Sequence, residues 1–288
     1  MTAQAISFPA GARVQHLSDG RLHLHHGPID LIVQAWGNPL AVRQATKRAI
    51  ARFATILEEL CEELPDLRSE TGSVSGETAR RMADAVAPFK PAFITPMAAV
   101  AGAVADTLIE FFAVEGIGRA YINNGGDIAL HLADGQALTC AIAAQPGFPD
   151  RLNIPACSKV RGIATSGWRG RSFSLGIADS VTVLAHSAAM ADAAATMIAN
   201  QVDLPGHPAV QRRPACELQL DNDLGSRPVT VSVGGLTTSD RAKALDRGLA
   251  YAQQLMAREL IEGAALFLQD DVRLTGFPTL NSAELTHV

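Results

Sequence analysis

The chain has 288 residues, of which 48% are hydrophobic and 18% charged, and its formal net charge is −5. This length and composition can bury a sizeable core, and we expect a single domain over 1–275 followed by a loose tail over 276–288. The negative net charge argues against a nucleic-acid partner, because phosphate backbones attract basic surfaces. We expect no membrane span, since charges interrupt every long apolar run.

The cysteines and the N-terminal stretch predict a compartment. Residues 1–15 lack the basic start and long apolar core of a secretory signal. The four cysteines lie far apart and form no Cys-x-x-Cys pair; they are Cys61, Cys140, Cys157 and Cys216. We interpret them as buried or incidental thiols and expect a cytoplasmic protein.

The segment 21–36 predicts a β-hairpin, because it alternates in polarity and breaks at Gly27. Its three histidines, His23, His25 and His26, have no carboxylate or cysteine at a diagnostic metal spacing. We therefore interpret this part of the chain as a surface hairpin rather than a metal site.

Helical periodicity appears first over 38–64, where Asn38 followed by Pro39 fits an N-cap and a first helical position. A shorter helix is expected over 77–88. Thr95 fits the N-cap of a further helix that begins at Pro96 and is rich in alanine and glycine. The bare start of that helix can receive an anion or a flat ligand, or it can pack tightly against another backbone.

A turn of two glycines, Asn124-Gly125-Gly126-Asp127, separates two apolar runs that predict strands. The turn is typical of a hairpin. Two adjacent glycines also allow backbone to approach a phosphate or a ribose. Further strands are expected over 138–144 and 160–164.

The segment 161–200 carries the most chemistry. A basic loop around Arg169 and Arg171 precedes a strand over 180–185 and an alanine-rich helix over 188–200. Asp192 and Thr196 lie one turn apart on that helix, and their oxygens suit Mg²⁺ or Ca²⁺ better than zinc. The alternative is an exposed Asp192 near the helix start and a Thr196 bonded to its own helix backbone.

The last third of the chain predicts a loop over 205–228, a strand over 229–233, a helix over 239–261 and a final strand over 264–269. The helix cap is expected at Ser239 or Asp240. The acidic triplet 221–223 resembles a calcium loop, but the closing glutamate is missing.

Four motifs in order give the chain a resemblance to the ApbE superfamily, and in particular to its compact branch called the UPF0280 family. They read TPMAAVAGAVAD, NNGGDIAL, ATSGWRGRSFSLGIADSVTVLA and ADAAATMIAN, within about 96–200. The superfamily includes the FAD:protein FMN transferases, which move FMN from FAD onto a protein threonine or serine. The resemblance implies an α+β, T-fold-like antiparallel sheet with packed helices.

The resemblance also implies ligand-binding roles. Asp192 and Thr196 match the residues that hold Mg²⁺ against the FAD pyrophosphate in the transferases. The residues that would border or contact FAD, FMN or another phosphate-bearing ligand are Asn124, Gly125, Gly126, Asp127, Thr165, Ser166, Gly167, Arg169 and Arg171. The two arginines would supply positive charge for an anionic ligand.

Two groups of the transferase motifs are missing here. Ala101 stands in the place of a lysine, and Gly176 in the place of a histidine. Asp179 is the remaining titratable group of the second motif and hence the candidate catalytic residue.

Three functions stay open: an ApbE-type enzyme, a binding or accessory protein without transfer chemistry, and a component of homocysteine-forming sulfur assimilation that uses Cys157. The last comes from the resemblance alone, as does an expected redox or flavoprotein partner. Apolar helices and open strand edges make a homo-dimer an expected assembly.

Overall fold

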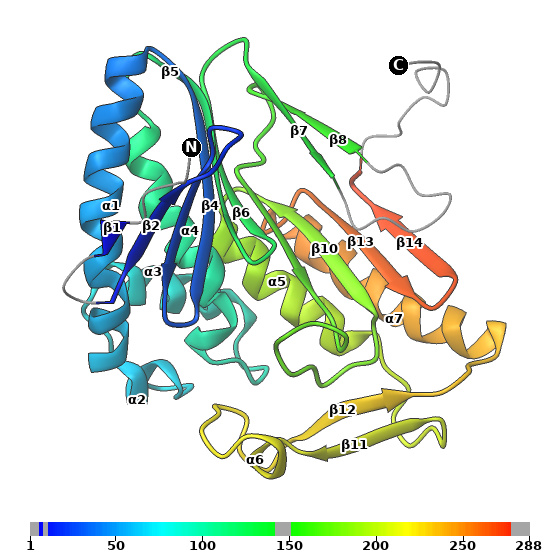
Figure 1. Ribbon diagram of the computed structural model, residues 1–288. Coiled ribbons are helices and arrows are strands. Elements are labelled where there is room, and N and C mark those ends of the chain that lie inside the picture. The colour runs from blue at the N-terminus through cyan, green and yellow to red at the C-terminus, as the bar shows by residue number, and fades with distance from the viewer. Residues whose placement is uncertain (1–5, 8–10, 142–150, 278–288) are drawn as a thin grey trace.

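A ten-stranded antiparallel sheet runs through the molecule (Figure 1). The structure is a computed structural model that describes residues 6–7, 11–141 and 151–277. The strands, in their order across the sheet, are β1 (Ile6–Ser7), β2 (Arg13–His16), β3 (Leu22–His26), β4 (Ile29–Gly37), β5 (Ile117–Asn124), β6 (Asp127–Leu132), β9 (Gly162–Ser166), β10 (Ser180–Ala185), β13 (Gly263–Leu268) and β14 (Asp271–Thr275).

Two hairpins lie apart from this sheet. They are β7 (Ala137–Ala141) with β8 (Arg151–Pro155), and β11 (Val210–Pro214) with β12 (Pro228–Val233). The β7–β8 hairpin covers part of the face that carries no helices, where Leu130, Leu152 and Ile163 belong to a second, smaller apolar core.

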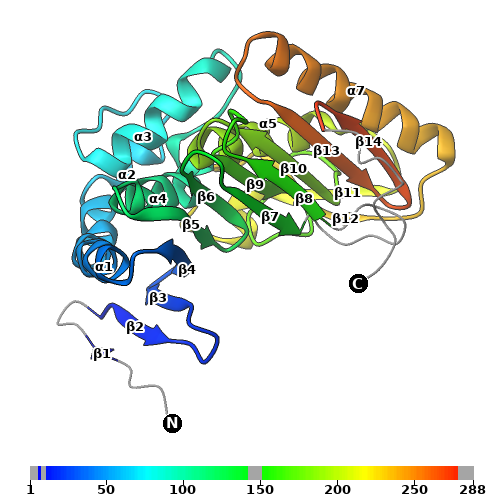
Figure 2. The same cartoon turned by 90° about the horizontal axis from the view of Figure 1, so that it is seen from above.

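The long helices pack on the opposite face of the sheet, as the view from above shows (Figure 2). The helices are α1 (Pro39–Glu62), α2 (Leu64–Leu67), α3 (Glu77–Val86), α4 (Val100–Ile109), α5 (Ala188–Gln201), α6 (Ala215–Leu218) and α7 (Thr238–Ala257), with 3-10 turns η1 (Ala87–Phe89), η2 (Pro96–Ala99) and η3 (Glu110–Phe112). The main core lies between these helices and the sheet. Alternating polarity in the strands and helical periodicity in α1 and α7 produce this two-layer arrangement.

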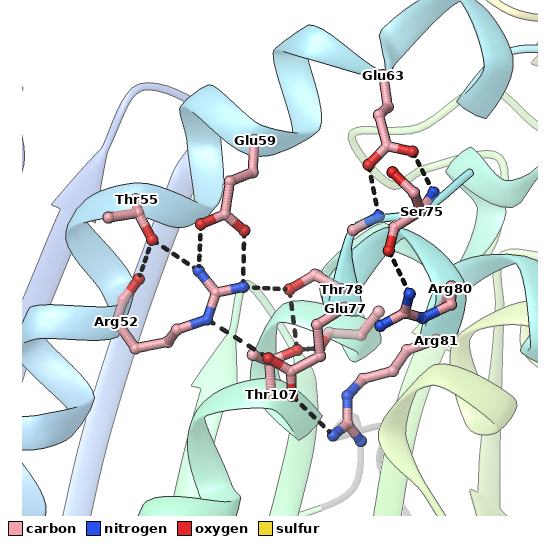
Figure 3. A network of polar contacts seen from close by, with 12 residues as sticks. Arg52, Thr55, Glu59, Glu63, Ser75, Glu77, Thr78, Arg80, Arg81 and Thr107 are labelled. Atoms are coloured by element: carbon pink, nitrogen blue, oxygen red, sulfur yellow. Dashed lines mark hydrogen bonds and ion pairs between the residues drawn. The ribbon is translucent and has the colours of Figure 1, made fainter.

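A polar network fixes α3 between α1 and α4 (Figure 3). Arg52 of α1 donates two 2.8 Å hydrogen bonds to Glu59 and a longer one to Thr78 of α3. Glu63 accepts the backbone N–H groups of Ser75 and Gly76, directly before α3 begins. Arg52 and Glu63 thus join the second half of α1, and the residue after it, to α3, and the hydroxyls of Thr78 and Thr107, 3.1 Å apart, join α3 to α4.

Most predicted elements form. Asn38 caps α1, and its side-chain oxygen accepts the N–H groups of Leu40 and Ala41. Strands β1, β2, β8, β11 and β14 are additional, because short strands with polar residues give weak sequence patterns. The end of the predicted strand over 138–144 lies outside the described residues, which break off at residue 141. The predicted tail lies outside them from residue 278.

Two local expectations are wrong and one holds only in part. Thr95 stands at the N-cap position and Pro96 begins the turn, as expected, but the Thr95 hydroxyl donates to Asp223 instead of accepting a helix N–H, and the first turn is the 3-10 turn η2. Helix α7 is capped by Thr237 rather than by Ser239 or Asp240, and it ends at Ala257. His26 is buried on the helix-covered face of β3 rather than at the surface, since it packs against Phe53 of α1.

Candidate functional site

Helices α4 and α5 approach one another through small residues. A Cβ atom on Gly102 of α4 would lie 2.2 Å from the carbonyl oxygen of Ala188, in the first turn of α5. Only a glycine permits this approach. Of the two interpretations of the alanine-rich helix start, tight packing against another backbone is therefore the one that the structure shows.

Each of these helices carries an aspartate at the N-terminus of the other. Asp106 of α4 accepts the N–H groups of Ala188 and Ala189 at 2.9 and 2.8 Å. Asp192 of α5 accepts the N–H of Gly102 at 3.1 Å. Carboxylates satisfy the free amides of a helix start and interact well with its dipole. The two aspartates thus form reciprocal caps, and the prediction of an exposed Asp192 is wrong.

A second carboxylate lies close to Asp192. Asp127 is the first residue of β6 and accepts the N–H of Thr165 in β9 at 3.2 Å. Burial raises the pKa of Asp192 well above the usual range, and the charge of Asp127 raises it further. Burial also raises the pKa of Asp127, to about 7, against the opposing effects of the Thr165 N–H and of Arg171. Like charges in a poorly solvated place are costly together.

Arg171 brings positive charge to this place from the loop between β9 and β10. Gly125 and Gly126 form the β5–β6 turn with φ angles of +64° and +119°. A Cβ atom on Gly125 would lie 1.9 Å from the Nη2 atom of Arg171. The guanidinium therefore lies against the glycine turn, and the predicted turn, Asp127 and Arg171 come together in one place.

Hydroxyl groups lie along the neighbouring strand end. Thr196, one turn after Asp192 on α5, has its hydroxyl 3.5 Å from that of Ser166 at the end of β9. The hydroxyls of Thr165 and Thr182 are 2.9 Å apart on adjacent strands. Thr196 therefore faces β9, and the side-chain to backbone interaction considered for it is not the contact found.

Three of the predicted ligand residues make structural contacts. The amide of Asn124 donates to the carbonyl of Ala101 at 3.1 Å and fixes the start of α4. Gly167 leaves room for the carbonyl of Asp179, which a Cβ atom would approach to 2.4 Å. Arg169 is 62% exposed and pairs with Asp179 at 2.7 Å.

The Asp179 carboxylate has three donors. Besides Arg169, the indole Nε1 of Trp168 donates to it at 3.1 Å, and the backbone N–H of Gln269 donates from the turn between β13 and β14. These contacts hold the loop that carries Arg171 against the sheet. The catalytic role of Asp179 stays a prediction, while its contacts describe a positioning residue.

Oxygen atoms dominate this site. Across the parts of the chain that the structure describes, no three histidine, cysteine, aspartate or glutamate side chains are grouped as a metal site. The two carboxylates with the hydroxyl of Thr196 provide hard donors, which fit Mg²⁺ bound together with oxygens of a ligand better than a closed zinc site. The residues present therefore fit the metal that the resemblance implies.

Sequence reasoning missed Asp106 and the closeness of Asp127 to Asp192. The role of Asp106 has a signal in the sequence, because each alanine-rich helix contains one aspartate among small residues. The closeness of Asp127 to Asp192 depends on the pairing of β6 with β9, in which Ile128 lies opposite Ile163, far along the chain. Cys157, considered for sulfur chemistry, is exposed in the turn after β8.

Comparison with known proteins gives the family. A sequence profile described as "AbpE bacteria" matches residues 14–274. The chain belongs to this ApbE-like family. Its similarity extends to proteins named UPF0280: the one from Archaeoglobus fulgidus is 36% identical over 158 residues, 54% of this chain and 64% of the relative. The one from Methanosphaerula palustris is 40% identical over 170 residues, 57% of this chain and 65% of the relative.

These alignments span less than two thirds of the length of the curated relatives. Among solved structures, a variant of the flavin transferase ApbE from Vibrio cholerae aligns over 96% of this chain and 97% of its own, at 14% identity and a TM-score of 0.45. An ApbE protein from Thermotoga maritima aligns over 94% and 96%, at 12% and 0.43. The predicted family is confirmed, as is the α+β fold with an antiparallel sheet. Within the described ranges, no helix is long and apolar enough to cross a bilayer.

Proposed function

We propose that this ApbE-like protein binds a flavin nucleotide, or another phosphate-bearing ligand, together with a divalent metal. The observation that carries the proposal is the placing of two half-buried carboxylates together, Asp127 at the start of β6 and Asp192 in α5, where the charge of Asp127 raises the pKa of Asp192. A divalent cation removes that repulsion, since it neutralises both carboxylates and favours their charged forms. A flavin is the ligand that membership of the ApbE-like family suggests.

In this proposal Asp192, Thr196 and Asp127 hold Mg²⁺, and ligand phosphate oxygens complete its coordination. When bound, the metal would neutralise charge on a diphosphate and act as a Lewis acid there. Arg171, which lies against the Gly125–Gly126 turn, would pair with a phosphate through its guanidinium. Ser166 and Thr165 would border the same ligand.

Binding without transfer is the form that the contacts favour. A transfer from FAD would break the phosphoanhydride, form a phosphoester with a hydroxyl and release AMP, and it needs a base for the hydroxyl proton. The candidate base, Asp179, accepts hydrogen bonds from the Trp168 indole and the Gln269 backbone and pairs with Arg169, so its oxygens are already engaged. Turnover therefore stands as a separate question from binding.

The test is a calorimetric titration of FAD into the protein with and without Mg²⁺. We expect Mg²⁺-dependent binding that Asp192→Asn removes and that Asp84→Asn, a change at an exposed aspartate of α3, leaves within about twofold. Analysis of the same samples for AMP separates binding from transfer. An FAD affinity that is the same with and without Mg²⁺, and the same in Asp192→Asn, would contradict the proposed metal role.

A further inference from the structure

A cavity of about 710 Å³ lies between the first half of α1 and the strands β2 to β4. Phe112, in η3 after the end of α4, forms part of its wall, whereas Gly102 near the start of α4 contacts Asp192. The cavity is therefore at the other end of α4 from the carboxylate pair. It is a separate site, and a ligand bound there would be independent of the proposed function.

The walls of this groove are largely apolar. Its apolar lining comes from two strands, α1 and η3, and includes Leu22, Val33, Ala35, Val42, Ile50 and Phe112. The lining stretch of α1 from residue 39 to residue 51 is about 18 Å long at 1.5 Å per residue. A long, apolar slot of this volume matches the usual size of small-molecule sites.

Two cations stand at the edge of the slot. Arg43 and Lys47 lie one helical turn apart on α1, line the groove and are exposed. Among the described contacts neither makes an ion pair or a hydrogen bond, whereas Arg52 on the same helix pairs with Glu59. No acidic side chain is found among the described residues that line the groove.

The charge of α1 is divided along its length. Its first five turns contain four basic residues and no acidic one, and its acidic residues begin at Glu58. The groove is thus positive although the whole chain carries −5. Unpaired cations beside an apolar slot are complementary to a ligand that has an anionic head and an apolar body.

We propose that this groove binds an amphiphile with one acyl chain and one anionic head group, either a carboxylate or a phosphate. The acyl chain lies along the apolar walls, and Arg43 and Lys47 bind the head group at the rim. The lining favours an acyl chain over a flat ring system, because Phe112 is its one aromatic apolar side chain among the described residues and flat rings gain from stacking on several.

The test titrates dodecanoate, dodecyl phosphate and neutral dodecanol into the full-length protein, below the concentrations at which they form micelles. Three variants decide the site. Arg43→Glu with Lys47→Glu reverses the rim charge, Thr46→Trp fills the slot, and Arg48→Glu reverses an exposed charge on the same helix that does not line the groove.

We expect one dodecanoate or dodecyl phosphate per chain, and about tenfold weaker binding for dodecanol and for the double charge variant. Thr46→Trp should abolish binding, and Arg48→Glu should change it by less than about threefold. Tighter binding of one anion over the other identifies the head group. Equal weakening by Arg48→Glu, unchanged binding in Thr46→Trp, or no binding of either anion would overturn the proposal. Light scattering that shows a dimer in the unaltered protein and a monomer in the same variants would also overturn the proposal, because the groove would then be a contact between two copies of the chain.

Discussion

Asp106 and Asp192 occupy equivalent places on two crossing helices, and the difference between them locates the proposed site. Asp106 is buried and Asp192 half-buried, both cap the partner helix, and loss of solvation raises the pKa of both. Asp106 accepts two short backbone hydrogen bonds, and the charges of Arg81 and Glu110 act on its pKa in opposite directions. Asp192 accepts the N–H of Gly102 at a longer 3.1 Å, the N–H of Ala101 also lowers its pKa, and the charge of Asp127 raises that pKa more than the charge of Asp106 does.

Capping therefore explains one aspartate fully and the other only in part. A cap requires a single carboxylate, and Asp106 shows that this arrangement is complete by itself. The second carboxylate at Asp192 adds repulsion without adding a hydrogen bond to the helix. Such a pair is costly in the folded protein unless a cation joins it. Substitutions at the two positions should separate the two roles, with the largest effect on ligand binding.

Ligand binding should distinguish the two aspartates most strongly. Asp192→Asn should weaken Mg²⁺-dependent FAD binding by about a hundredfold or more, because it removes a metal ligand. Asp106→Asn should leave the affinity of folded protein within about threefold. Calorimetry on both variants measures this, and equal losses would show that Asp192 acts through helix packing alone.

Stability should show the opposite order. Asp106→Ala should lower the free energy of unfolding by about 2 kcal/mol, since it leaves two helix-start amides without a buried partner. Asp192→Ala should cost less than about 1 kcal/mol without metal, because the lost cap is offset by the lost repulsion from Asp127. Urea unfolding in a chelating buffer gives both values, and a larger loss for Asp192→Ala would reverse the comparison.

Arg171 should matter for the ligand more than for the fold. Arg171→Ala should weaken FAD binding by about tenfold, because a charge-assisted phosphate contact is lost. It should also raise the pKa of Asp127, on which the guanidinium acts. Arg213→Ala, at an exposed arginine of β11 that pairs with Glu217, serves as the control. Equal affinities in the two variants would remove Arg171 from the site.

The pH dependence of stability tests the electrostatic origin of the repulsion. The folded-state pKa values of Asp106 and Asp127 are raised to about 6 and about 7, against about 3.9 in an unfolded chain. The folded protein therefore binds more protons between about pH 4 and pH 7, and the metal-free protein should lose stability as the pH rises through that window. Asp127→Asn should make the loss of stability with rising pH smaller, because it removes one carboxyl group with a raised pKa. A profile that rises across the window in chelator would contradict the raised pKa values.

The same titration predicts how cation binding responds to acid. Binding requires charged carboxylates, so Mn²⁺ affinity should fall as the pH drops below about 7, where Asp127 takes up a proton. The change should be smaller in Asp127→Asn, which has lost that titration. Fluorescence or relaxation titrations with Mn²⁺ at several pH values provide the measurement.

The sequence predicts the local elements of this site well and their assembly poorly. The glycine turn, the Asp192–Thr196 spacing and the basic loop are local patterns, and each forms where it was expected. The position of Asp192 at the start of α4 is not local, because it follows from the close approach of Gly102 to the Ala188 carbonyl. The closeness of Asp127 needs the β6–β9 pairing, and the free cations of the groove need the packing of α1 on β4. Side-chain periodicity carries no information about such long-range pairings.

Whether Asp127 and Asp192 together hold a divalent cation is tested most directly by an electron paramagnetic resonance titration of Mn²⁺ in the presence of FAD. The samples are the unaltered protein, Asp127→Asn, Asp192→Asn and the control Asp84→Asn. We predict one bound Mn²⁺ per chain in the unaltered protein and in Asp84→Asn, and strongly weakened binding in the other two. Unchanged Mn²⁺ binding in both Asp127→Asn and Asp192→Asn, or no bound Mn²⁺ in any sample, would contradict the shared-cation site.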